Sequence, residues 1–445
     1  MFEELKRLFA SDAPSRDGLT RGDGAVLEVL DLGLLRSEAR AADIAAGRIS
    51  AKDPAQRRLE AARVWRELAR RTGDPAALRK AAQGAEKAAD LFKAAGRHKA
   101  WAAARCEQAM CAMLGVELYG DEGLYAAADL ALAEAVAAAP NGPGAALATG
   151  QLARLKARAV LCEGPYEAVM AVASSFDGPI ERLAPHLRSR AVSKGALADI
   201  RCARAELLIA AAARLGDARL YAQAMTEMDA LAGGLDGAYE PLARGRALAL
   251  SAAARVGFGR LQDRIEDIAQ AVDILTSAID GLSSDHSPLD WAGLQHALAR
   301  ALQALGEASQ ADLALEQALG CYRRAQWAVR DKPALALRAA ISRGYAGCLA
   351  QRAALAADPR LLDQAVDQLV QDLRGLHPGR NPVGWAVAQV NLAQLYAARH
   401  DLEGGSNDRA AAALALSSAI EVFDEHGLVP LIEDASAALA ALEGR

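Results

Sequence analysis

The sequence predicts an all-α protein, a right-handed α-solenoid of about eight antiparallel helical hairpins. Three observations indicate this fold: a segment that recurs 94 residues later, turn signals spaced near multiples of 47 residues, and an alanine-rich composition with only 4% aromatic residues. Alanine and unbranched side chains lose little conformational entropy in a helix, so this composition favours helix over sheet. A regular repeat of this length is typical of stacked helical hairpins rather than of one globular core.

The recurring segment reads P-L-D-W-A-G-L-Q-H-A-L-A-R-A-L at 288–302 and P-V-G-W-A-V-A-Q-V-N-L-A-Q-L-Y at 382–396. Six identities share the offset of 94, which is twice 47: Pro288, Trp291, Ala292, Gln295, Leu298 and Ala299 recur as Pro382, Trp385, Ala386, Gln389, Leu392 and Ala393. In the later copy, Trp385, Leu392 and Tyr396 lie on one stripe of a helix. The segment therefore predicts the first helix of a hairpin, packed through this stripe against a second helix.

Turn signals separate the two helices of each predicted hairpin. Glycine accepts the left-handed conformation that ends a helix, and aspartate caps the start of the next one. Six dipeptides occupy these places: Gly73-Asp74, Gly120-Asp121, Gly216-Asp217, Gly306-Glu307, Asp358-Pro359 and His400-Asp401. The predicted hairpins span residues 54–97, 98–142, 143–188, 189–236, 237–285, 286–332, 333–378 and 379–427, of which the third and fifth are the most degenerate.

The two ends of the chain do not match the repeat array, which is predicted over residues 54–427. Residues 25–53 are expected to form N-terminal capping helices, and residues 428–445 a C-terminal capping helix that covers the last apolar face. Residues 1–24 are expected to form a short amphipathic helix followed by a polar linker. Four apolar side chains would share one side of that helix: Phe2, Leu5, Leu8 and Phe9.

Such a helix can fold back onto its own solenoid, dock on a partner or lie on a membrane. Its polar side carries two acids and two bases, without the basic excess that binding to anionic lipid requires. Membrane contact is therefore expected least, and only through this helix.

Charge and composition restrict the class of protein and its partners. The net charge is −5 and no basic stripe is present, so no nucleic-acid partner is expected. The six cysteines are scattered without a CxxC pair, which favours reduced, buried thiols. Residues 1–10 alternate charged and apolar side chains, unlike a secretory signal, and no segment suits a membrane span. We expect a cytoplasmic protein, and 42 arginines against 9 lysines indicate a GC-rich bacterial genome.

Residues 385–396, followed by a turn and an alanine-rich second helix, resemble the tetratricopeptide repeat (TPR) superfamily. The long-helix bacterial forms akin to kinesin light chain are the most similar. Leu392, Ala393 and Tyr396 stand where that family has large, small and large packing residues. The unit of about 47 residues exceeds the family's usual 34, and the proline that closes the second helix is mostly absent. The resemblance implies a scaffold that binds another protein.

Motifs of enzyme active sites are missing from the sequence. Gly257-Phe258-Gly259 lacks the third glycine of a dinucleotide fingerprint, and no P-loop, HExxH, GxSxG or metal-type His/Cys spacing occurs. The sequence therefore predicts a non-enzymatic protein with no metal and no cofactor.

The inner-face positions of the superfamily supply candidate binding residues on the first helices of the last three hairpins. These candidates are His296, Arg300, Gln303, Arg343, Asn391 and Gln394. Their guanidinium and carboxamide groups could hold a carboxylate or an extended backbone. Ordinary solvated helix residues would show the same pattern.

The predicted function is a protein-interaction scaffold or adaptor that presents a concave helical groove to a protein or peptide. Two alternatives remain open. One is a regulatory sensor whose solenoid changes shape on binding a peptide or small ligand. The other is a structural protein that associates with copies of itself.

Overall fold

The computed structural model describes residues 24–48, 52–121, 123–160, 165–187, 194–375, 382–404 and 406–443. Every regular element within these ranges is a helix. The fold is therefore all-α, as the sequence predicts. The proposed amphipathic helix with Phe2, Leu5, Leu8 and Phe9 lies outside the described residues.

The helices form successive hairpins that fall within the predicted ranges. Seven hairpins consist of two long helices each: α5 (Pro54–Thr72) with α6 (Pro75–Ala94), α7 (His98–Tyr119) with α8 (Gly123–Ala138), α12 (Lys194–Leu215) with α13 (Ala218–Gly234), α14 (Pro241–Leu261) with α15 (Ile265–Asp280), α16 (Pro288–Ser309) with α17 (Asp312–Val329), α18 (Leu335–Ala356) with α19 (Arg360–Gly375), and α20 (Pro382–Glu403) with α21 (Ser406–Glu425). The last helix, α22 (Val429–Glu443), packs against α21.

The third hairpin lacks a continuous second helix. After α9 (Pro143–Val160) come α10 (Tyr166–Ser175), α11 (Asp177–Leu183) and the 3₁₀ turn η1 (Ala184–Leu187). Pro179 explains the first break, because a proline ring clashes with the carbonyl four residues earlier, here that of Ser175 at the end of α10.

The Gly-Asp turns behave as the sequence predicts. Gly73 and Gly120 end α5 and α7 in the left-handed conformation, each with a φ of +71°. The carboxylates of Asp74 and Asp217 then cap α6 and α13 by accepting hydrogen bonds from backbone N–H groups at 2.8 and 2.9 Å. Local sequence thus sets where these helices stop and start.

Two of the predicted turn positions are wrong. α16 continues past Gly306 and ends at a left-handed Gln310, and α20 continues past His400 and ends at Gly404. Gly306 instead lies where α16 crosses α17, and a Cβ there would lie 2.8 Å from the Cγ of Leu315. Glycine is needed at this position for close helix packing rather than for a turn.

The same close crossing recurs in other hairpins, always between a glycine and a large side chain nine residues later. The three pairs are Gly115 with Leu124, Gly259 with Ile268, and Gly306 with Leu315. Gly259 and Gly306 are 47 residues apart, which is one repeat. The Gly257-Phe258-Gly259 segment therefore has a packing role, since Gly257 lies against the ring of Tyr221 on α13.

Replacing Gly257 by alanine is expected to destabilise the protein by about 1–3 kcal/mol, because the new Cβ overpacks this contact. A Cβ at Gly257 would lie 2.3 Å from the Tyr221 ring. Gly293→Ala on α16 is the matched control, since no atom lies within 4 Å of its Cβ position. The control should stabilise its helix by up to about 1 kcal/mol. Equilibrium denaturation measures both variants, and equal midpoints would contradict the packing role.

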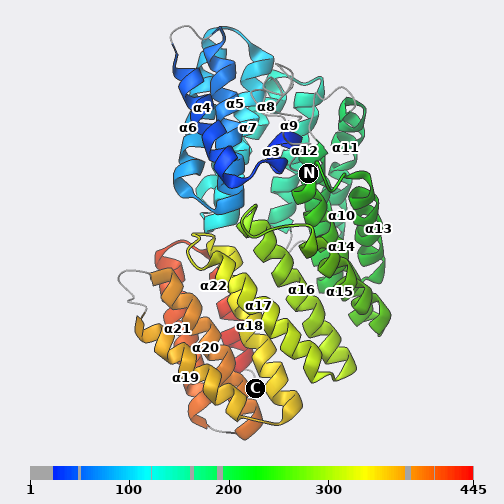
Figure 1. The fold of residues 1–445 in the computed structure, drawn as a ribbon, viewed down its shortest axis with the longest axis vertical. Helices are drawn as coiled ribbons and strands as arrows, with labels where there is room; N and C mark the ends of the chain where they lie inside the picture. The colour runs from blue at the N-terminus through cyan, green and yellow to red at the C-terminus, as the bar shows by residue number, and fades with distance from the viewer. Residues whose placement is uncertain are drawn as a thin grey trace.

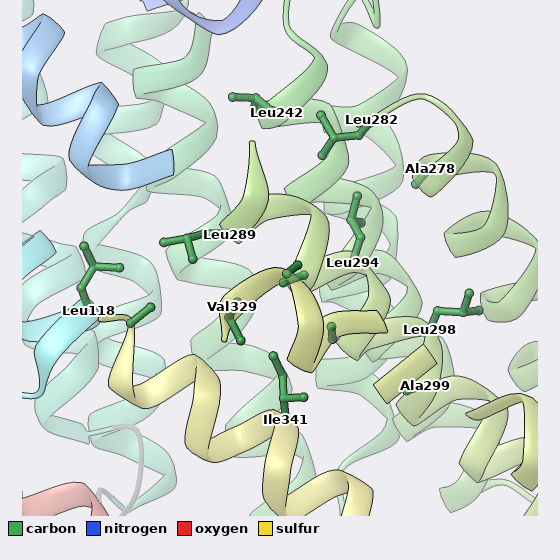
Figure 2. Close-up of a cluster of buried hydrophobic side chains, with 14 of the residues drawn as sticks. Leu118, Leu242, Ala278, Leu282, Leu289, Leu294, Leu298, Ala299, Val329 and Ile341 are labelled. Carbon is green, nitrogen blue, oxygen red and sulfur yellow. The ribbon is translucent and has the colours of Figure 1, made fainter. Parts of the chain in front are cut away.

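The array curls until its first hairpins pack against its later ones. Figure 1 shows it running from α4–α8 at the upper left, through α12–α15 on the right, to α19–α21 at the lower left. One apolar cluster joins Leu68 and Leu118 of the first two hairpins to Leu289 and Ile341 of α16 and α18. Figure 2 shows Leu118, Leu289 and Ile341 in this cluster. A Cβ at Gly73 would lie 3.5 Å from Leu289, so the turn after α5 touches the start of α16.

The N-terminal segment strengthens this closure. α4 (Leu32–Gly47) packs on α5 as a cap, whereas α3 (Gly24–Val29) crosses to α12 and α14. The carboxylate of Glu28 accepts hydrogen bonds from the backbone N–H groups of Leu242 and Ala243, both at 3.0 Å, at the start of α14. The guanidinium of Arg71 donates to the carbonyls of Leu30 and Glu28 at 2.6 and 2.7 Å. α3 thus ties the first hairpin to the fifth.

Candidate functional site

The first helices of seven hairpins line a cavity with a volume of about 420 Å³ that is partly open to solvent, which we call the lumen. These helices are α5, α7, α9, α12, α14, α16 and α18. A volume of this size lies within the range of small-ligand sites. Nine charged side chains line the lumen: Arg66, Arg70, Glu117, Arg154, Arg158, Asp199, Glu206, Arg246 and Asp290.

Arg70 connects the two halves of the lumen wall. On α5 its guanidinium donates to the carboxylate of Glu67 at 2.8 and 2.9 Å, and across the lumen it donates to both oxygens of Asp290 at 2.9 and 3.0 Å. Ser287 also donates to Asp290, at 2.6 Å. Burial alone would raise the pKa of Asp290, but Arg70 and Arg246 outweigh it and hold this pKa below its ordinary value. Asp290 is therefore ionised and held by its partners.

Two further ion pairs of the lumen wall also join neighbouring first helices. The guanidinium of Arg246 on α14 donates to Asp199 on α12 at 2.8 Å and lies 3.7 Å from Asp290. Arg154 on α9 pairs with Glu117 on α7. Three of the four lumen carboxylates are therefore paired with an arginine.

Glu206 on α12 is the exception. Its side chain is exposed to the lumen, yet among the described residues its carboxylate accepts no hydrogen bond and makes no direct ion pair. Enclosure by protein raises the pKa of Glu206 to about 7. Arg154 and Arg246 act against this rise, whereas Glu117 and Asp199 add to it. A carboxyl group with a raised pKa and no ion-pair partner among the described residues therefore faces the lumen.

None of the six residues predicted for binding lines the lumen. His296, Arg300 and Arg343 do lie near one another, on α16 and α18. Burial, followed by the charges of the two arginines, lowers the pKa of His296 to about 4. Its neutral ring packs on Tyr322 with 5.9 Å between ring centroids. His296 is thus part of the packing between helices.

Both the nitrogen and the oxygen of the Gln303 side-chain amide form hydrogen bonds. Its Nε2 donates to Gln351 at 3.0 Å, and its Oε1 accepts from the Tyr322 hydroxyl at 2.9 Å. These hydrogen bonds connect α16 with α17 and α18. Gln303 therefore holds neighbouring helices together in this structure.

α22 covers part of the remaining predicted positions. Arg343 pairs with Asp434 on α22, and both residues line a small cavity together with Asn391. Asn391 also lines a second cavity of about 470 Å³ between α17, α18, α19 and α20. The Oδ1 of Asn391 and the Oε1 of Gln394 are buried without a hydrogen-bond donor. This second cavity is walled mainly by apolar residues.

Sequence reasoning missed the lumen residues because it took the last three hairpins as the site. The lumen draws most of its charges from α5, α7, α9, α12 and α14. Charged residues such as Arg154 and Glu206 within alanine-rich first helices are a weak signal of an inner face. Only the curling of the array identifies which of these faces meet.

The described part of the chain has no metal-type cluster of three or more His, Cys, Asp or Glu residues. Its five described cysteines are free and buried. Burial raises the pKa of Cys202, which lines the lumen, to about 12. Over the same ranges, the structure has no helix with the length and apolar character needed to span a membrane.

Comparison with known proteins gives distant structural likenesses. No family model and no curated protein matches this chain. A human IFIT1 dimer with PPP-AAAA has a TM-score of 0.41 and 13% identity, covering 98% of this chain and 96% of that chain. A Rap protein complexed with competence and sporulation factor has a TM-score of 0.38 and 9% identity, covering 95% and 98%. At these values the likeness concerns helical-repeat architecture alone.

Proposed function

We propose that this chain is a non-enzymatic binding protein of the TPR-like kind, and that its lumen binds a peptide segment of a partner. One observation carries this proposal: charged side chains surround a void inside the array. Buried ion pairs stabilise a fold no better than well-packed apolar side chains do, and a void forfeits packing contacts. A charged void therefore weakens the fold and is useful only when something occupies it.

The chemistry of the lumen suits a peptide better than a polyanion. Five arginines are accompanied by four carboxylates, so a nucleic acid would meet repulsion as well as attraction. A peptide presents backbone amides and side chains of both signs, which can bind such a wall by charge-assisted hydrogen bonds. Met110, Met113 and Leu155 add apolar lining that adapts to side chains of different shape.

A sensor role is the second candidate, because residues that line the lumen also hold the first hairpins against the later ones. Arg70 and Asp290 face the lumen and join α5 to α16. A ligand that competes for either group would change how the first hairpins pack on the later ones. Binding and shape would then be coupled through this ion pair.

The test is affinity selection from a library of end-blocked random hexapeptides, read by mass spectrometry. Ala203→Phe and Ala157→Phe each place a phenyl ring at the lumen wall, and Ala230→Phe on the exposed side of α13 is the control. Equilibrium denaturation checks that each variant folds. Lumen filling should reduce peptide affinity by about 10-fold or more, equivalent to about 1.4 kcal/mol. The control should bind as the original chain does.

A fourth variant separates the lumen from the inner face of the last hairpins. Arg300→Glu/Arg343→Glu reverses two charges that do not line the lumen. Peptides that still bind the lumen-filled variants but do not bind this double variant would place the binding site on α16 and α18. Failure of the intact chain to enrich any peptide would refute the proposed function.

A further inference from the structure

Three of the four lumen carboxylates already have a cation. Asp290 and Asp199 accept hydrogen bonds from Arg70 and Arg246, and Glu117 pairs with Arg154. Within the described ranges, Glu206 has no such partner although it projects into the same space. Of the four lumen carboxylates, this one is therefore the position where a cation delivered by a ligand would form a new ion pair without displacing an arginine.

The groups that face Glu206 are two ion pairs, each made of one arginine and one carboxylate. Glu117 on α7 and Asp199 on the same helix, α12, both act on it as neighbouring negative charges. Arg154 and Arg246 also act on it, but their guanidinium groups are directed to Glu117 and Asp199. A further cation placed at Glu206 would complete a third ion pair beside the two existing ones.

The remaining lining determines what kind of cation fits. A hydrated divalent metal needs several oxygen ligands, and the neighbouring carboxylates are bound to arginines. A basic side chain instead has an aliphatic stem, which can pack on apolar lining such as Met113 and Leu155. A lysine or arginine side chain thus matches both features of the lumen.

We propose that the lumen binds a peptide with a basic side chain, whose cationic head pairs with the carboxylate of Glu206. This inference rests on the proposed function, because it assumes that a peptide enters the lumen. It adds the chemical class of the ligand. Arg154 and Arg246 hold their own carboxylates in place while Glu206 recognises the incoming charge.

The experiment compares Glu206→Gln with Glu266→Gln, an exposed control on α15, in the same hexapeptide selection. Peptides retained by the original chain and lost on lumen filling should be enriched in lysine or arginine. Glu206→Gln keeps the shape of the side chain and should abolish that enrichment, whereas Glu266→Gln should preserve it. For one selected peptide, Glu206→Gln should weaken binding by about 30-fold or more at pH 8.

Replacing the basic residue of the ligand completes a double-mutant cycle between the ligand and Glu206. The same peptide with norleucine in place of its basic residue should bind the original chain and Glu206→Gln with equal affinity. Affinity for the basic peptide should also fall between pH 8 and pH 6, because only the ionised carboxylate pairs with the cation. Glu206→Gln should lose this pH dependence.

Failure of this inference differs from failure of the proposed function. Lumen-dependent binding without a preference for basic residues, or without an effect of Glu206→Gln, would overturn the inference and leave the function standing. If no peptide is retained by the intact chain, both are refuted.

Discussion

Arg70→Ala is expected to lower the free energy of unfolding by about 3–5 kcal/mol, because it removes the closest cationic partner of two largely buried carboxylates. Arg70 donates four hydrogen bonds to Glu67 and Asp290, and both acids are largely buried. The same substitution disconnects α5 from α16. We therefore expect a lower denaturation midpoint together with a larger radius of gyration in solution scattering.

Two further variants isolate the cause. Arg219→Ala removes an arginine that also pairs with an aspartate but is 85% exposed, and should leave the denaturation midpoint almost unchanged, because solvent screens this pair. Combining Arg70→Met with Glu67→Gln and Asp290→Asn also removes the two carboxylate charges that Arg70 pairs with. This triple variant should recover a large part of the lost free energy of unfolding. An Arg70→Ala variant as stable as Arg219→Ala would show that the closure does not depend on this network.

Glu28→Gln is expected to stabilise the protein at pH 8 and to have little effect at pH 5. Burial raises the pKa of Glu28 from its ordinary 4.5 to about 7, against the opposing effects of Arg246 and of the hydrogen bond from Ala243. Between these two values the folded state holds a proton that the unfolded state releases. The contribution of Glu28 to stability therefore falls as the pH rises from about 4.5 to 7, by about 3 kcal/mol in total.

Glutamine retains an oxygen that can accept from the N–H groups of Leu242 and Ala243, but it cannot ionise. The measurement is the free energy of unfolding of both proteins from pH 5 to pH 8. Their difference should grow with pH in favour of the glutamine variant. Glu28→Ala removes the acceptor and should be less stable than Glu28→Gln at every pH. Parallel pH profiles for the original chain and Glu28→Gln would mean that Glu28 ionises normally in the folded state.

Much of the secondary structure could be predicted because its causes are local. Gly73 and Gly120 end helices where expected, since a left-handed residue and a capping aspartate act within one turn of the chain. Gly306 misled the prediction because glycine serves two purposes in these hairpins, and its use at a helix crossing depends on Leu315 of the next helix.

The candidate site was much less predictable. Arg343 and Asn391 were proposed because they match inner-face positions of the TPR superfamily, but α22 covers them in part. Glu206 belongs to no sequence motif, and its proposed role follows from the absence of a partner, in the part of the chain that the structure describes, within the space that the first helices surround. Repeat spacing alone contains no information about that enclosure.

The sequence by itself determined that this protein is an array of helical hairpins, and where most of its helices begin and end. Helix periodicity and capping are interactions among residues a few positions apart, so they can be read directly from the chain. Only the tertiary structure decided that the array closes on itself and encloses a charged lumen. That closure results from small rotations accumulated from hairpin to hairpin, which bring Arg70 to Asp290 across 220 positions of sequence.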